Sequence, residues 1–193
     1  MRRRNGLNFS RRRKKMNIPL LKEILSWVVE CAIVIVIAYT LVNSFGFRTS
    51  VVGTAMMDTL SNDEQIFINR FVYMIKEPQQ GDVIVFRPNG NEKSHYYVRR
   101  VIAGPKDTVW IHDGAVYVNG ELYNEDILVS SIEDPGLASE EITLGSGEYF
   151  VLGDNRNNSE DSRMANIGNI KKEYIIGKAW FRFQDFGDMG FIH

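Results

Sequence analysis

The sequence predicts a mainly β protein, in which an antiparallel β-sheet domain follows one N-terminal transmembrane helix. Three observations lead to this prediction. A strongly basic tail opens the chain, an apolar run with a single charge follows it, and short β-rich runs separated by turn signals make up the rest. These features divide the chain into a basic cytoplasmic tail (1–23), a transmembrane anchor (24–45) and an extracytoplasmic β domain (46–193).

Composition excludes several classes of protein. The chain has 193 residues, 44% of them hydrophobic, which is enough for one domain core and too apolar for a disordered chain. A formal net charge of −1 argues against nucleic-acid binding. The single cysteine, Cys31, rules out an internal disulfide framework and any zinc site built from several cysteines.

The small net charge conceals an asymmetry that predicts topology. Residues 1–23 carry a net charge of +8, and residues 24–193 carry −9. As a helix, residues 24–45 would be about 33 Å long, which is enough to cross a hydrocarbon core of about 30 Å. Trp27 lies near the basic end, where an interfacial aromatic is expected, and Glu30 is early enough to reach the headgroups. Basic flanks stay in the cytoplasm, so we expect a single-pass cell-membrane protein with its body outside.

Two other interpretations of the apolar run fit less well. A buried core helix would not need flanking arginine clusters. A cleaved signal peptide would have the same order of charge, but this run is long for such a segment. The small-residue pattern at its end, Ser44-Phe45-Gly46, matches a cleavage site only weakly. An uncleaved anchor is therefore the preferred interpretation.

Runs rich in β-branched and aromatic residues predict the strands of the body. They are Phe47–Val52, Gln65–Asn69, Val83–Phe86, Tyr96–Ile102, Thr108–His112, Ala115–Val118, Tyr149–Leu152 and Ala179–Phe183. The dipeptide Asp113-Gly114 between two of these runs predicts a two-residue hairpin. Residues 121–146 are expected to form an acidic surface loop, and residues 171–175 a short helix or turn.

Metal, cofactor and nucleotide sites have little support. His95, His112 and His193 are scattered, and no H-x-x-H or H-E-x-x-H pairing is present. The chain also lacks G-x-S-x-G, a Walker loop and G-x-G-x-x-G. The sequence therefore predicts no cofactor and no metal ion.

The densest polar cluster, residues 153–163, directly follows an apolar predicted strand. Its interleaved acids and arginines are suited to hold a loop rigid through charge-assisted hydrogen bonds, although a solvated turn would have a similar composition. We expect Asp161 and Arg163 to lie close to each other, or to Arg156 and Asp154, beneath a cleft.

This cluster resembles the hallmark box of bacterial type I signal peptidases, and the resemblance covers nearly the whole chain. The matching motifs are Val52-Gly53-x-x-Met56-x-x-Thr59-Leu60, Gly81-Asp82-Val83-Ile84-Val85-Phe86, Tyr97-Val98-Arg99-Arg100-Val101-Ile102, Pro105-x-Asp107, Tyr149-Phe150-Val151-Leu152-Gly153-Asp154 and Ser159-x-Asp161-Ser162-Arg163. One span and a compact body are similar to the Gram-positive arrangement. The resemblance implies a fold of antiparallel sheets, in agreement with the predicted strands.

In that family a serine attacks the scissile carbonyl and an uncharged lysine takes its proton. Burial makes such a lysine possible by lowering its pKa toward neutrality. The resemblance places the serine at position 55 and the lysine at position 99, but this chain has Ala55 and Arg99. Alanine has no hydroxyl, and a guanidinium stays protonated up to about pH 12. The usual proteolytic mechanism is therefore absent from the chain as written.

Other positions of the family site are retained. Ser159 matches the residue that orients the lysine, and Asp154, Asp161 and Arg163 match the scaffold of the box. Gly53 stands where some members place an oxyanion hydroxyl and others have glycine. Met56, next to the nucleophile position, is assigned to the substrate cleft, which in the family is shallow and accepts small residues.

Several further positions depart from the family pattern. Asp58 replaces the usual proline, and Ala103 and Lys106 replace glycines. Thr54 or Thr59 could offer a hydroxyl and His95 a base, but Thr54 is one residue out of register in an extended segment. Together with the loss of both dyad residues, these departures favour a natural non-catalytic paralogue over an engineered trapping mutant.

Three functions remain open from the sequence. The first is a family member that engages exported chains without cleaving them, with a chaperone or adaptor role in secretion or pilus assembly. The second is an active signal peptidase that uses unrecognised groups or was altered at these positions, and the third is a structural anchored domain. The implied partners are signal peptides or exported preproteins and the lipid bilayer. An open cleft beside position 55 would favour the first two functions, and a blocked one the third.

Overall fold

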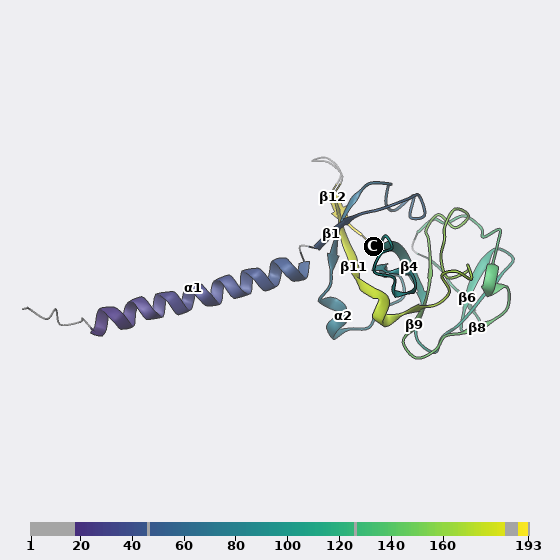
Figure 1. Ribbon diagram of the computed structural model, residues 1–193. Helices are drawn as coiled ribbons and strands as arrows, with labels where there is room; N and C mark the ends of the chain where they lie inside the picture. Colours follow the sequence, from purple (N-terminus) through teal and green to yellow (C-terminus); the bar gives the residue numbers. More distant parts are fainter. Residues whose placement is uncertain (1–17, 46, 126, 184–188, 193) are drawn as a thin grey trace, which may run out of the picture. The chain divides into compact units, whose positions relative to one another are not determined.

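The computed structural model describes residues 18–45, 47–125, 127–183 and 189–192. Contacts divide the chain into two compact units, residues 1–40 and 41–193, and each is described by itself. Figure 1 follows the chain from its N-terminal helix into the β-rich body.

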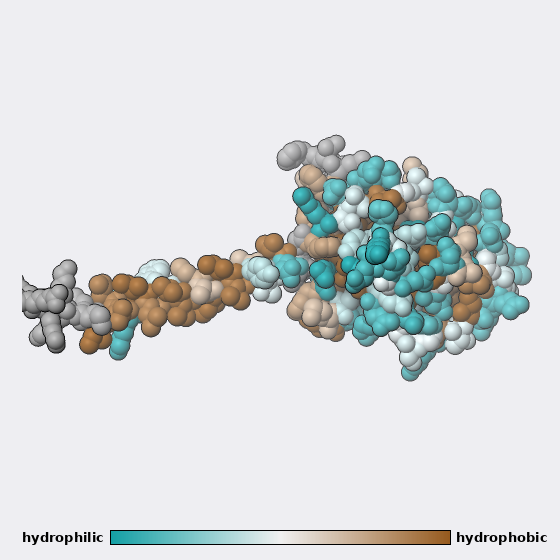
Figure 2. Space-filling model, in the orientation of Figure 1, coloured by the Kyte–Doolittle hydropathy of each residue, from teal (hydrophilic) through white to brown (hydrophobic). Residues whose placement is uncertain are grey.

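Helix α1 (Ile18–Phe45) contains the predicted anchor and begins six residues before it. Pro19 is tolerated there because the first turn of a helix has no partner for its N–H groups. Residues 18–43 form one helix that is long and apolar enough to cross a membrane, and none of its residues is buried inside the protein. The large apolar side chains of α1 are exposed, as the brown surface of this helix in Figure 2 shows.

The body is built mainly on one large antiparallel sheet. Its hydrogen-bonded order is β1 (Phe47–Ser50), β2 (Gln65–Asn69), β11 (Ile175–Phe183), β3 (Val83–Phe86), β4 (Tyr97–Ala103), β9 (Glu148–Leu152) and β10 (Ile170–Lys171), with β12 (Met189–Phe191) paired to β11. The prediction of a mainly β fold of antiparallel strands is confirmed.

A smaller antiparallel sheet completes the body. Its order is β7 (Glu121–Leu122), β6 (Ala115–Val118), β5 (Thr108–His112) and β8 (Ile142–Thr143). Figure 1 shows β6 and β8 on the side of the body away from β1 and β12. Asp113 and Gly114 both have positive φ, +49° and +75°, as a type I′ turn requires, and they close the predicted hairpin between β5 and β6.

Most strand predictions are confirmed, and the differences have tertiary causes. Strand β11 begins at Ile175, four residues before the predicted start, because residues 175–178 pair with β3. The predicted loop 121–146 contains β7, β8 and the 3₁₀ helix η2 (Gly136–Ser139). These pieces pair with or pack on the β5–β6 hairpin, which gives short polar segments a partner that their own composition does not indicate.

Short helical turns fill the remaining connections. They are α2 (Val72–Ile75), η1 (Pro88–Gly90) and η3 (Lys172–Tyr174), the last of which lies within the predicted helix or turn at 171–175. Three apolar clusters form the core of the body, one over β1–β2, one between the two sheets and one on the β3–β4–β9 face. This core fixes β4 in the middle of the large sheet, so the side chains of β4 have rigid support.

Candidate functional site

A cleft of about 530 Å³ opens on the body where three segments meet. The segments are the turn after β1, the start of β4 and the loop after β9. The lining residues are Val52, Gly53, Thr54, Ala55, His95, Tyr96, Tyr97, Arg99, Asn157, Asn158, Ser159, Glu160 and Met164. Ala55, Arg99, Ser159 and Gly53, which lie far apart in the sequence, are thus brought to one cleft.

Ala55 sits where the turn after β1 packs against the loop after β9. The residue is 8% exposed, and its carbonyl oxygen accepts a hydrogen bond of 3.0 Å from the Asn155 N–H. A Cβ on Gly153 would lie 2.5 Å from the same oxygen. Glycine at position 153 therefore permits the close approach that builds this side of the cleft.

Arg99 reaches the cleft from β4 and is only 6% exposed. Its Nε donates to the Glu160 carbonyl at 2.9 Å and its Nη1 donates to the Val98 carbonyl at 2.7 Å, while the guanidinium carbon lies 5.0 Å from the Tyr97 ring centre. Burial lowers the pKa of Arg99, and the nearby Asp161 carboxylate opposes that shift. The guanidinium remains charged at neutral pH and cannot act as a base.

Ser159 lines the same cleft. Its Oγ is buried and has no hydrogen-bond partner among the described residues. An unpaired buried hydroxyl of this kind is unusual in a folded protein.

Strand alternation sends the neighbouring residue, Arg100, to the other side of β4. There it makes two hydrogen bonds to the Asp154 carboxylate, of 2.9 and 2.7 Å, and one to the Gly81 carbonyl. The Thr59 hydroxyl also donates to Asp154, at 2.5 Å. Burial by itself lowers the pKa of Arg100, but its hydrogen bonds to Asp154 and the nearby negative charges together raise it.

The loop after β9 is held by a second buried ion pair. Arg163 contacts both oxygens of Asp161, at 2.8 and 2.9 Å, and Asp161 also accepts from the Gly153 N–H at 3.1 Å. The expected proximity of Asp161 and Arg163 is therefore observed. Arg156 instead pairs with Glu125, a residue that sequence reasoning missed because it lies in the 121–146 segment with no motif around it.

Met56 does not lie in the cleft to which it was assigned. Its side chain is 1% exposed and packs in the apolar cluster over β1–β2. The turn that places residue 55 at the cleft directs residue 56 inward, so Met56 supports the site from beneath. The cleft surface is formed instead by residues that the sequence did not assign to the site, among them Tyr97 and Glu160.

The other hydroxyl and imidazole groups considered for catalysis are hydrogen-bonded, lie outside the cleft or have no paired carboxylate among the described residues. Thr54 lines the cleft, but its hydroxyl accepts a hydrogen bond of 2.8 Å from the Asn158 side chain. Thr59 is tied to Asp154, and it is not among the residues that line the cleft. His95 is exposed at the cleft, with no described carboxylate paired to it.

Two family departures have a backbone explanation. Asp58 has a φ of +90°, which a proline ring cannot adopt, so the turn after position 55 differs from one built on proline. Lys106 has a φ of +73° in the turn that begins at Gly104. Glycine is the residue that favours this conformation, in keeping with the glycine that the resemblance implies at this position.

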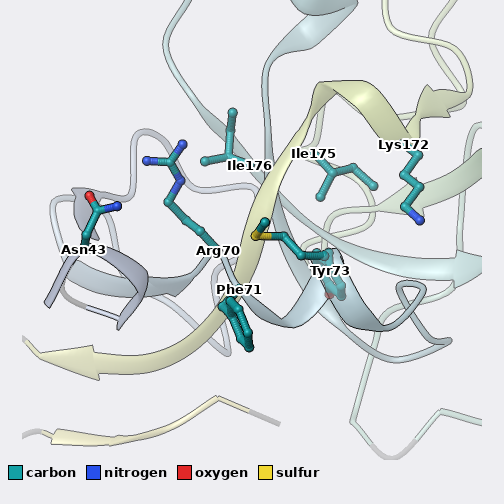
Figure 3. Close-up of a pocket in the computed structure, with 8 residues that line it drawn as sticks. Asn43, Arg70, Phe71, Tyr73, Lys172, Ile175 and Ile176 are labelled. Carbon is teal, nitrogen blue, oxygen red and sulfur yellow. The ribbon is translucent and has the colours of Figure 1, made fainter. Parts of the chain in front are cut away.

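A second hollow, of about 360 Å³, lies away from these residues. Its lining includes Asn43, Arg70, Phe71 and Lys172 (Figure 3), and it contains none of the predicted site residues. Across the described residues, no group of three or more histidine, cysteine or acidic side chains is placed to hold a metal ion. The cleft beside Ala55 is therefore the candidate site.

The fold and the cleft define the class of protein as a mainly β domain that follows one apolar helix in the chain. Comparison with known proteins identifies the family. The family described as signal peptidase, peptidase S26, matches residues 24–184, and the chain belongs to this family.

Individual relatives are similar over most of their length. Signal peptidase I P of Bacillus subtilis subsp. natto is 35% identical over 174 residues, which cover 86% of this chain and 89% of the relative. Signal peptidase I S of Bacillus subtilis strain 168 is 34% identical over 189 residues, which cover 91% of this chain and 97% of the relative. A crystal structure of a signal peptidase I from Enterococcus faecalis V583 matches with a TM-score of 0.42 and 30% identity, covering 54% of this chain and 97% of that one.

Proposed function

We propose that this protein binds the signal peptides of exported preproteins in the cleft beside Ala55, at the outer face of the membrane, and does not cleave them. The observation that carries the proposal is the pair Ala55 and Arg99 on one cleft. Position 55 supplies no nucleophile, and position 99 holds a permanent cation that two backbone carbonyls fix in place. The relatives are signal peptidases, which supports signal peptides as the ligand class.

The state of the cleft favours peptide binding over a purely structural role. The cleft is open, and apolar and small side chains line it next to the turn after β1. The buried ion pairs of Asp154 and Asp161 hold the loop that forms its other side. A domain that had lost all ligand binding would have no need for this support. We propose that it acts as a chaperone or adaptor in secretion or in the assembly of surface structures such as pili.

The alternative is an active signal peptidase that uses other groups. Thr54 and His95 are the candidates that share the cleft. The Thr54 hydroxyl is engaged by Asn158, and a threonine alone has no activating base. The contacts therefore favour binding without turnover.

A crosslinking experiment tests the proposed function. The photoreactive residue p-benzoylphenylalanine is placed at His95, which is exposed at the cleft, and at His112, an exposed histidine on β5, as the matched control. We expect a preprotein carrying an intact signal peptide to crosslink to position 95 and not to position 112, and to remain uncut. Absence of a crosslink at position 95 would contradict peptide binding.

Topology is a separate prediction. With the basic tail inside, protease added to intact spheroplasts should degrade the body and leave only the anchor and tail. The measurement is an immunoblot with one epitope tag at each terminus, and protease added after lysis is the control. A body that stays protected in intact spheroplasts would contradict the proposed orientation.

A further inference from the structure

Arg99 differs from every other buried arginine in the described part of the chain. Arg100, Arg156 and Arg163 each form an ion pair with a carboxylate, on Asp154, Glu125 and Asp161. Arg99 is equally buried, yet no described carboxylate lies within ion-pair distance of it.

An unpaired buried cation is costly, and the two hydrogen bonds described for Arg99 use only part of its donor capacity. A guanidinium has five N–H donors, and two of those on Arg99 go to the Glu160 and Val98 carbonyls. The remaining donors belong to a residue that lines an open cleft. Buried charges in proteins are normally paired or coordinated, so the missing partner is expected to be an anion that enters the cleft.

The acidic groups near Arg99 are already engaged elsewhere. The Glu160 carboxylate accepts a hydrogen bond of 2.8 Å from the Tyr97 hydroxyl, which raises the pKa of that tyrosine, and Asp161 is held by Arg163. The Ser159 hydroxyl, on the same cleft, is a second polar group without a partner among the described residues. One carboxylate could accept from both a guanidinium and a hydroxyl, and carboxylates match the planar fork of arginine.

We propose that this cleft recognises the free C-terminal carboxylate of a peptide, with Arg99 as the charged anchor and Ser159 as a further donor. The inference rests on the proposed function, since it takes the cleft to be a peptide site. An intact preprotein presents only a neutral peptide bond there, whereas hydrolysis of that bond creates a carboxylate on the released signal peptide. The preferred ligand is therefore the product of a cleavage carried out by a different, active peptidase.

A matched pair of peptides tests this specificity. Both carry the same fluorescent label and the same apolar sequence ending in Ala-x-Ala, one with a free carboxylate and the other with a carboxamide. Binding to the full-length protein in lipid nanodiscs is followed by fluorescence anisotropy. We expect the acid to bind about tenfold more tightly or better, which is the usual size of a charge-assisted hydrogen-bond contribution.

Variants assign the preference to Arg99. Arg99→Gln should abolish the difference between acid and amide, and Arg70→Gln, outside the cleft, should leave it unchanged. Equal binding of both peptides by the unmodified protein would overturn this inference and leave the proposed function standing. Failure of both peptides to bind would overturn the proposed function and this inference with it. The comparison on the unmodified protein does not depend on the folding of any variant.

Discussion

Ala55→Ser combined with Arg99→Lys should give this protein measurable signal-peptide cleavage, which neither single change should give. The serine alone has a cation beside it and no base, and the lysine alone has no hydroxyl to activate. In the double variant, a lysine buried in the place of Arg99 should have a lowered pKa because burial disfavours its charged form. The Ser159 hydroxyl, which has no described partner, would then have an amine to orient.

The expected gain is large, because a nucleophile and its base act as one unit and loss of either removes most of the rate. The measurement is the rate of conversion of a preprotein to its mature form at neutral pH. Asp58 should keep the rate below that of active relatives, since its φ of +90° gives a turn that a proline cannot form.

Two controls make the result specific. Ala55→Ser combined with Arg70→Lys, which restores the serine and makes the same conservative change outside the cleft, should stay at background. Ser159→Ala added to the active double variant should reduce its rate. Clear turnover by the unmodified chain that is lost on Thr54→Ala or His95→Ala would instead show that the protein is a peptidase with different chemistry.

Asp161→Ala should destabilise the body more than any surface substitution. The Asp161 side chain is fully buried and holds Arg163, which is itself 2% exposed, and it also accepts from the Gly153 N–H. Removing one partner of a buried pair leaves an uncompensated charge, at a cost of about 3–5 kcal/mol. For a domain of this size, the melting temperature should fall by roughly 6–20 °C.

Glu92→Ala is the matched control. Glu92 pairs with Arg87 at 3.6 Å, but its side chain is 85% exposed. Exposed pairs contribute about 0–1 kcal/mol, so the melting temperature should change little. Thermal unfolding of the full-length protein in detergent, followed by circular dichroism, gives both values. If Asp161→Ala had the same melting temperature as the unmodified protein, the loop after β9 would not depend on this ion pair.

The local features of the fold were predictable because local physics decides them. An apolar stretch long enough to span a bilayer favours a helix. Helix α1 contains the predicted span, residues 24–45, and begins six residues before it. Strands β2, β3, β5 and β6 have the predicted bounds, since β-branched runs end at clear turn signals. The Asp113-Gly114 hairpin follows from the positive φ values that these two residues tolerate.

The motifs of the site were also visible in the sequence, and so were Ala55 and Arg99 at the two positions where the resemblance implies a serine and a lysine. Ala55 and Arg99 could be assigned because motifs surround them on both sides. Sequence alone misplaced Met56, since neighbouring residues of a tight turn go to opposite environments. Only the folded chain shows that residue 55 faces the cleft and that Met56 fills the core.

Sequence reasoning alone was enough for the family, for a helix long and apolar enough to span a membrane and for the antiparallel strands. The tertiary structure decided which charges have partners. Asp161 and Arg163 are two residues apart and their pairing could be predicted, whereas the partner of Arg156 is Glu125, 31 residues away in a segment without motifs. The tertiary structure likewise shows that, among the described residues, Arg99 has no carboxylate partner and the Ser159 hydroxyl on the same cleft has no hydrogen-bond partner. The choice of ion-pair partner depends on which distant segments the core brings together, and this cannot be predicted from a local pattern of residues.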